Sequence, residues 1–151
     1  MRSTWLVMMT LAALVAVGYT TLGSAEPQVG QTPPTVLLNV TSGDEDLLAV
    51  TTAFHVAEHS LARGRTAVLF FNVRGPVIAS KRLPETTKLG GDPPIRQQLA
   101  ELIRKGAKVY VCPYCVKAAG LRKEDLVAGV ELATPEKIFD HVHANSVVFS
   151  Y

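Results

Sequence analysis

Short apolar runs rich in β-branched residues alternate with longer amphipathic stretches along most of the chain. The first of these runs, residues 35–40, is typical of a buried strand, and apolar residues recur at helical spacing over residues 47–61. Gly64 ends this helical pattern just before a second buried run at residues 66–71. The pattern therefore predicts a strand, a helix and a second strand in succession.

The alternation continues after a long polar segment, residues 74–92, that is rich in glycine and proline. Asp92 and the two prolines after it predict the start of a helix, whose pattern ends at Gly106. The further elements that we expect are a strand at residues 109–111, a short helix to Ala119, a strand near residues 130–132, a helix opened by Thr134 and a last strand at residues 147–149.

Short strands that alternate with helices predict a parallel sheet, because parallel strands need crossover connections that place helices over the sheet. We therefore expect an α/β fold, in the form of a three-layer α/β/α sandwich around a mainly parallel sheet of about five strands. Ligands of such sheets bind beyond the carboxyl ends of the strands, so a functional site is expected at that edge.

The beginning of the chain has the features of a secretory signal peptide. Arg2 precedes an uncharged apolar run, and residues 23–25 are the small residues that a signal peptidase recognises. The apolar run is shorter than a membrane-spanning helix requires. We expect residues 1–25 to be a cleaved signal peptide, residues 26–34 a flexible leader and residues 35–151 the folded domain. The mature protein would then be periplasmic or secreted, and would not be held at the membrane after cleavage.

Composition narrows the class of protein. Of the 151 residues 48% are hydrophobic and 19% charged, with a mean hydropathy of +0.21, which excludes a disordered chain. The formal net charge of +2 leaves no excess for binding a phosphate backbone, so we expect no nucleic-acid partner. The sequence has no glycine-rich dinucleotide fingerprint and no phosphate loop, and we expect no cofactor.

The candidate chemistry is concentrated in Cys112-Pro113-Tyr114-Cys115, directly after the predicted strand at residues 109–111. A cysteine in the first turn of a helix has its thiolate stabilised by the unpaired N–H groups there, which makes it a nucleophile. A cysteine one helical turn further along can attack a mixed disulfide or a persulfide formed on the first. We expect Cys112 to attack and Cys115 to resolve. We also expect the loop over residues 74–92 to cover them as a lid through Pro76, Val77 and Ile78.

A structural disulfide and a metal site are the other interpretations of the cysteine pair. A bridge that closes so short a loop would contribute only about 2 kcal/mol to stability. A metal would need further ligands, and the candidates His141 and His143 lie in or beside a predicted helix with no cysteine near them in the sequence. His55 and His59 share a helix face without an identifiable third ligand, so we expect no metal site.

The four residues from Cys112 to Cys115 are identical to the active-site tetrapeptide of glutaredoxins, a resemblance that implies thiol–disulfide chemistry. In that family the motif follows the first or second strand, and a cis-proline segment comes much later. Here a large part of the domain precedes the motif, and Thr134-Pro135 is better explained as a helix start.

A second resemblance covers nearly the whole domain, from about Val36 to Tyr151. The segments that carry it are Asn72-Val73-Arg74-Gly75 after the second strand, the strand that runs into the cysteine pair, Gly120-Leu121, the stretch over residues 125–131, and the closing Ser146-Val147-Val148-Phe149. In these segments and their spacing the chain resembles the DsrE/DsrF/TusD family, also called DsrE-like.

That resemblance implies a small α/β/α subunit that forms homo-oligomers, whether dimers, trimers or hexamers. It also implies a cysteine that carries sulfane sulfur as a persulfide, and Cys112 matches that position. We therefore expect a periplasmic sulfur carrier that acts through Cys112 with Cys115 and meets a sulfur-donor or redox partner protein. The alternatives are a thiol–disulfide oxidoreductase that uses the same pair and a non-enzymatic oligomeric binding protein.

Overall fold

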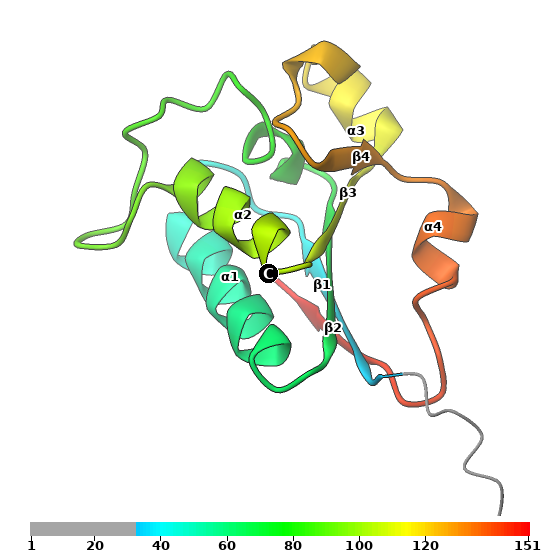
Figure 1. The fold of residues 1–151 in the computed structure, drawn as a ribbon. Coiled ribbons are helices and arrows are strands. Elements are labelled where there is room, and N and C mark those ends of the chain that lie inside the picture. Colours follow the sequence, from blue (N-terminus) through cyan, green and yellow to red (C-terminus); the bar gives the residue numbers. More distant parts are fainter. Residues whose placement is uncertain (1–32) are drawn as a thin grey trace, which may run out of the picture. The chain divides into compact units, whose positions relative to one another are not determined.

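Within the described part of the chain, residues 33–151, five parallel strands form one sheet in the order β4-β3-β2-β1-β5 (Figure 1). The structure is a computed structural model, and the predicted signal peptide and nearly all of the predicted leader lie outside the described residues. The strands are β1 (Thr35–Val40), β2 (Thr66–Phe71), β3 (Lys108–Val111), β4 (Val130–Leu132) and β5 (Val147–Ser150).

Helices connect these strands in the predicted alternation. They are α1 (Leu47–Leu61), α2 (Ile95–Arg104), α3 (Pro113–Ala118) and α4 (Pro135–Phe139), with short 3-10 turns η1 (Gly75–Val77) and η2 (Lys123–Asp125). The predicted α/β fold with a parallel sheet of five strands is therefore confirmed. Across residues 33–151, no helix has both the length and the apolar character to span a bilayer.

Side chains that follow the strands begin two of the helices. Asp46 is the N-cap of α1, where its carboxylate accepts the N–H of Ala49 at 3.0 Å. Thr134 is the N-cap of α4, where its hydroxyl accepts the N–H of Lys137 at 3.3 Å. Each cap satisfies an N–H that has no partner inside its helix, which sets the point where the helix begins.

Helices α1 and α2 cover one face of the sheet and form the main core with it (Figure 1). Phe54 of α1 meets Phe71 of β2 edge to face, with ring centroids 6.3 Å apart. Alternate residues of the central strands point to this side because side chains alternate across a strand. The fully buried members of this core include Leu38, Val40, Ala53, Ala57, Ala67, Leu69, Leu99 and Val111.

The opposite face of the sheet has a thinner cover. Helix α4 lies on that side in Figure 1, and the Tyr110 hydroxyl of β3 is hydrogen-bonded to Nε2 of His141 just after α4, at 3.2 Å. Val148 pairs with Leu37 in register, so it shares this face, and it is 55% exposed. Helix α4 and the residues after it therefore cover this face of the sheet beside β3 and leave the face exposed at β5.

The long segment between β2 and α2 is held to the core. Ile78 in this segment is fully buried. The guanidinium of Arg96 on α2 donates to the carbonyl oxygens of Lys81 and Leu83 and pairs with the Glu85 carboxylate. The segment is therefore held to the rest of the domain by the burial of Ile78 and by the hydrogen bonds of Arg96.

Candidate functional site

Cys112 lies where β3 ends and α3 begins, at the carboxyl edge of the sheet. Its N–H donates to the carbonyl oxygen of Phe71 at 2.8 Å, and its own carbonyl accepts the N–H of Val116 at 2.9 Å. Pro113 occupies the first position of α3, where a missing N–H costs nothing. The backbone of Cys112 is thereby fixed between β2 and α3, at the edge where the sequence places it.

Cys115 lies one turn further along α3. Both cysteines are free thiols, and both are half-buried. The Cys115 Sγ accepts a hydrogen bond from the backbone N–H of Val73, over 3.1 Å. Burial raises the pKa of the Cys115 thiol, a hydrogen bond with Cys112 raises it further, and the Val73 N–H lowers it. Cys115 therefore holds its proton more tightly than an ordinary cysteine thiol does.

Val73, whose role the sequence analysis missed, stands in the turn after β2 with a backbone φ of 53°. Left-handed backbone is rare for a β-branched residue, and its side chain is 60% exposed, so burial of the side chain does not explain it. Asn72 precedes Val73 and Gly75 lies two positions after it, and such residues are typical of turns. They were a signal that the chain turns sharply here, but nothing in them indicated a contact with Cys115.

A chain of polar side chains crosses the same edge of the sheet. Asn72 Nδ2 donates to Asn39 Oδ1 at 2.5 Å, and Asn39 Nδ2 donates to Ser150 Oγ at 3.2 Å. These residues stand at the ends of β2, β1 and β5. The chain ties three strand ends together beside the cysteine pair, and strand order alone makes this possible.

The loop predicted to be a lid lies beside the cysteines in part. Its first turn, η1, packs against α3. Pro76 and Ile78, which the lid was expected to use, are both buried, and Ile78 belongs to the main core. The contact to the cysteines comes instead from Val73, immediately before the loop.

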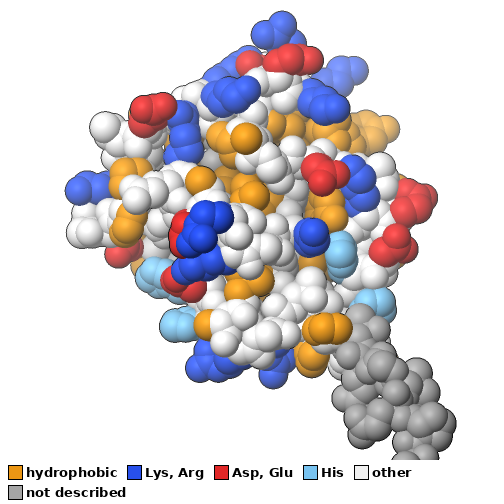
Figure 2. Space-filling view, viewed as in Figure 1, with side chains coloured by type: hydrophobic (Ala, Val, Ile, Leu, Met, Phe, Trp, Pro, Cys, Tyr) orange, Lys and Arg blue, Asp and Glu red, His pale blue; other side chains and the backbone are white. Residues whose placement is uncertain are grey.

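Charges near the site are paired and mixed in sign. The guanidinium of Arg74 pairs with the Glu45 carboxylate. The Gly43 N–H, with a smaller effect of Arg74, holds the pKa of Glu45 below its usual value. Figure 2 shows acidic and basic side chains interspersed over the face in view, with no large area of one sign.

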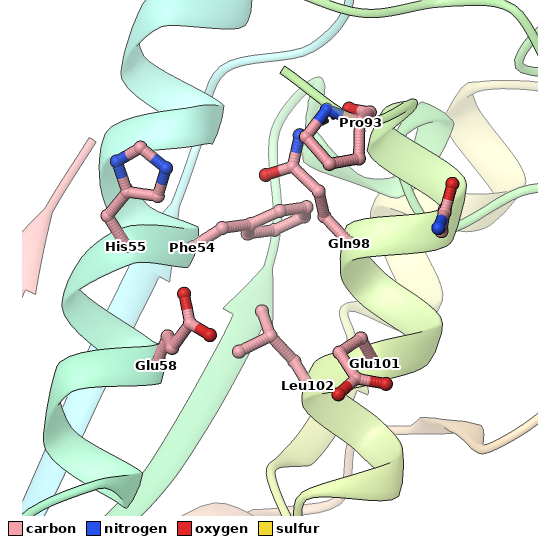
Figure 3. Close-up of a pocket in the computed structure, with 8 residues that line it drawn as sticks. Phe54, His55, Glu58, Pro93, Gln98, Glu101 and Leu102 are labelled. Atoms are coloured by element: carbon pink, nitrogen blue, oxygen red, sulfur yellow. Dashed lines mark hydrogen bonds between the residues drawn. The ribbon is translucent and has the colours of Figure 1, made fainter.

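A separate groove of about 180 Å³ lies between α1 and α2 (Figure 3). Phe54 and Leu102 form its apolar floor, and His55, Glu58 and Glu101 stand around it. Lys105 Nζ lies 2.7 Å from Glu58 Oε1 and 3.6 Å from Glu101 Oε1, so both carboxylates already have a cation. Neither cysteine lines this groove.

His141 and His59 have neighbours other than the cysteine pair. His141 contacts Tyr110, as described above, and His59 lines a shallow groove beside β5 with Arg63 and Arg65. Within residues 33–151, no group of three or more His, Cys, Asp or Glu side chains is placed to hold a metal ion.

Comparison with known proteins gives two similar sequences. The uncharacterized protein MK0008 of Methanopyrus kandleri is 32% identical over 100 residues, which are 65% of this chain and 78% of that protein. The uncharacterized protein MJ0989 of Methanocaldococcus jannaschii is 30% identical over 99 residues, which are 66% of this chain and 83% of that protein.

Two solved structures share the fold. The ychN protein from E. coli matches with a TM-score of 0.56 at 18% identity, over 79% of this chain and 99% of its own. MTH1491, a protein of unknown function from Methanobacterium thermoautotrophicum, matches with a TM-score of 0.60 at 14% identity, over 78% of this chain and 99% of its own. The model of the DsrE/DsrF-like family matches residues 35–150, which are the sheet and all its helices. The chain therefore belongs to the DsrE/DsrF-like family.

Proposed function

We propose that this protein is an exported sulfur carrier in which Cys112 holds sulfane sulfur as a persulfide and Cys115 takes part in its release. The observation that carries the proposal is a pair of half-buried free thiols at the carboxyl edge of a DsrE/DsrF-like sheet. Membership in that family supports a role in sulfur relay in general terms.

Loading requires an attack by the Cys112 thiolate on a sulfane sulfur of a persulfide or polysulfide donor. A bond forms between Cys112 Sγ and the transferred sulfur, the donor's S–S bond breaks, and the donor leaves as a thiolate with the electron pair. Cys115 keeps its proton because its pKa is raised, so its S–H group is available to hydrogen-bond the Cys112 thiolate before the attack. Tyr114 between the two cysteines is 86% exposed, which leaves the approach to α3 open to a donor protein.

A thiol–disulfide oxidoreductase is the second candidate function. The hydrogen bond between the two thiols favours it, because such a pair can close to a disulfide while a partner disulfide is reduced. The two functions use the same nucleophile and differ in what remains on Cys112 after the first step.

Export and self-association complete the proposal. Residues 1–25 have the composition of a signal peptide, which supports export to the periplasm or the medium. Val148 and Phe149 are 55% and 42% exposed on β5, and apolar side chains gathered at a sheet edge support assembly into a homo-oligomer. Sedimentation of the mature protein would measure the assembly, and N-terminal sequencing of the exported protein would measure cleavage.

Mass spectrometry tests the carrier function directly. The mature protein is reduced, incubated with polysulfide, freed of excess reagent and weighed intact and as peptides. A gain of about 32 Da on Cys112, reversed by reductant and absent from Cys112→Ser, is the result expected of a carrier. The Cys115→Ser variant is the matched control, because it keeps the nucleophile and is expected to hold the added sulfur longer.

A loss of about 2 Da instead, without any sulfur adduct in either single variant, would overturn the carrier proposal. That outcome would favour the oxidoreductase if the protein also turns over a disulfide substrate. It would favour a non-enzymatic binding protein if it does not.

A further inference from the structure

We propose that the Val73 amide is a positioning group for Cys115, held in place by a left-handed backbone so that it stabilises the Cys115 thiolate when Cys115 attacks an adduct on Cys112. This inference deepens the proposed function and rests on it for the identity of that adduct. Four observations carry it: the conformation of Val73, the bonds that impose this conformation, the direction of its N–H, and the balance of interactions at Cys115.

The conformation of Val73 is unfavourable by itself. Its φ of 53° is the one positive value among the non-glycine residues of the described chain. Left-handed backbone crowds the Cβ of any L-residue and crowds a β-branched one most. Conformations of this kind persist where the surroundings impose them, and they concentrate at functional sites.

The surroundings of Val73 do impose it. The N–H of Asn72 donates to the carbonyl oxygen of Val40 at 3.0 Å, and the N–H of Arg74 donates to that of Thr41 at 3.1 Å. The turn is closed by the N–H of Gly75, which donates to the carbonyl oxygen of Asn72 at 2.8 Å. Both neighbours of Val73 are thus fixed to the end of β1.

Gly75 explains how closely the turn lies against β1. A Cβ at this position would collide with the carbonyl oxygen of Val40 and lie 3.2 Å from the ring of Phe71. Only glycine allows this approach of two backbones. The turn is therefore held closely against the end of β1, and the Val73 N–H donates to Cys115 Sγ.

That N–H meets Cys115 Sγ at 3.1 Å. Because Asn72 and Arg74 are both held by hydrogen bonds, φ of Val73 can become negative only together with a rotation of the peptide between Asn72 and Val73. That rotation would turn the Val73 N–H away from Cys115. The strained backbone of Val73 therefore places a hydrogen-bond donor at Cys115. The Val73 side chain is exposed and gives no other reason for the strain.

The interactions at Cys115 change when Cys112 reacts. In the free dithiol, burial and the hydrogen bond with Cys112 keep the proton on Cys115 and raise its pKa, against the Val73 N–H. Once Cys112 carries a sulfur adduct, its thiolate charge is gone and that hydrogen bond has lost its acceptor. The Val73 N–H remains and favours a thiolate on Cys115 at the moment when Cys115 has to attack.

The resolving step balances within the protein. The Cys115 thiolate attacks Cys112 Sγ, a disulfide bond forms between the two cysteines, and the bond from Cys112 to the outer sulfur breaks. The outer sulfur of the protonated persulfide leaves with the electron pair as hydrosulfide, and the proton that Cys115 released stays in the water. The two cysteines are oxidised, the sulfane sulfur is reduced, and a dithiol or monothiol reductant returns the pair to its starting state.

A titration of the Cys115 thiol also depends on the other charged groups near it. Cys112 is the ionisable group that acts on Cys115, and Lys117 is exposed on the same helix. Arg74 on the turn is paired with Glu45, whose pKa is lowered, so the Glu45 carboxylate stays charged throughout the range in which a thiol titrates. Replacing Cys112 by alanine therefore isolates the effect of the Val73 amide.

The test removes the Val73 N–H and leaves its side chain. In the Cys112→Ala background, Val73 is replaced by its α-hydroxy acid analogue, which exchanges the amide for an ester. We expect the midpoint pH for alkylation of Cys115 by iodoacetamide to rise by about one unit, since a hydrogen bond to a charged group has been lost. The matched control is the same exchange at Val142, whose N–H donates to Phe139 at 3.0 Å beside α4, and there the midpoint should stay unchanged.

A kinetic readout in the full dithiol protein separates the two cysteines. An aryl disulfide reagent reacts first with Cys112, releasing one aryl thiolate, and the attack of Cys115 then releases a second. The ester at Val73 is expected to slow the second release about tenfold with the first unchanged. A general loss of structure would change the rates of both releases of aryl thiolate. A slower second release with an unchanged first release identifies the positioning role.

If the protein with the ester at residue 73 does not fold, an NMR titration of the Cys112→Ala protein tests the same hydrogen bond. The amide proton of Val73 should move downfield as Cys115 loses its proton, further than any other amide, because a thiolate is the stronger acceptor. Equal midpoints for the ester and the parent, or a Val73 amide that ignores the titration, would overturn the inference. If these readouts hold while polysulfide leaves no sulfur on Cys112 even in the Cys115→Ser variant, the positioning role stands and the carrier function fails.

Discussion

The side-chain amide of Asn72 lies 2.5 Å from Oδ1 of Asn39 and donates to it, so the ends of β2 and β1 are joined beside the cysteine pair. Asn39 in turn reaches Ser150 at the end of β5. Polar side chains with defined partners at this edge hold the turn that carries Val73, and their contributions can be measured separately.

Replacing Asn72 by alanine is expected to lower the free energy of unfolding by about 1 kcal/mol, because the partly buried Asn39 oxygen loses its donor. The Val73 amide should also exchange faster with solvent. Urea denaturation and hydrogen exchange measure the two effects. Ser150→Ala is the control, since its bond to Asn39 is exposed and water can replace it. Equal losses in the two variants would contradict this account.

Gly75→Ala should destabilise the protein by about 2 kcal/mol, since the new Cβ must displace the Val40 carbonyl or the Phe71 ring. Gly91→Ala provides the comparison, because its Cβ would meet nothing within 4 Å and its backbone is unstrained. Thermal unfolding of both variants measures the difference. A Gly75→Ala protein as stable as Gly91→Ala would show that the turn does not depend on this close approach.

Arg96→Met should loosen the segment between β2 and α2. Arg96 donates to the carbonyl oxygens of Lys81 and Leu83, which then lose a charged donor, and we expect a loss of about 2 kcal/mol. Limited proteolysis should cut within this segment sooner than in the parent protein. Arg104→Met removes an exposed arginine from the same helix and should change neither readout noticeably.

Stability should fall on mild acidification because of His141. Burial, the largest cause, lowers the pKa of His141 below its ordinary value of 6.5. As the pH falls through 6.5 the unfolded chain takes up a proton that folded His141 resists, so acid favours unfolding until the lower folded value is reached. Urea midpoints measured from pH 7.5 downward, at about half-unit steps, should show this slope.

His141→Gln removes the titration and keeps a group that can hydrogen-bond Tyr110, so its slope should be shallower in the same window. The exposed His55, changed to glutamine, is the control for the loss of a histidine elsewhere. An identical slope for His141→Gln and the parent would mean that another group governs the acid sensitivity.

The local pattern of the chain was enough to predict the elements and the class of fold. Apolar runs such as residues 66–71 and the helical spacing of residues 47–61 depend on neighbours in sequence, and each appears as expected in β2 and α1. The position of Cys112 followed for the same reason, because it comes directly after β3 and a strand ends at a defined edge of a parallel sheet. The contacts of the cysteine side chains could not be predicted in this way.

Contacts between distant segments were decided by the tertiary structure. Cys115 meets Val73, 42 positions away, and Asn72 meets Asn39, 33 positions away. These pairs exist because β1, β2 and β3 are adjacent in the sheet, and strand order does not appear in the periodicity of any one strand. The positive φ of Val73 is likewise imposed by bonds to the end of β1, against the preference of valine itself. The sequence by itself determined where the two cysteines stand, directly after a strand, and the packing of the strand ends decided which backbone amide contacts Cys115.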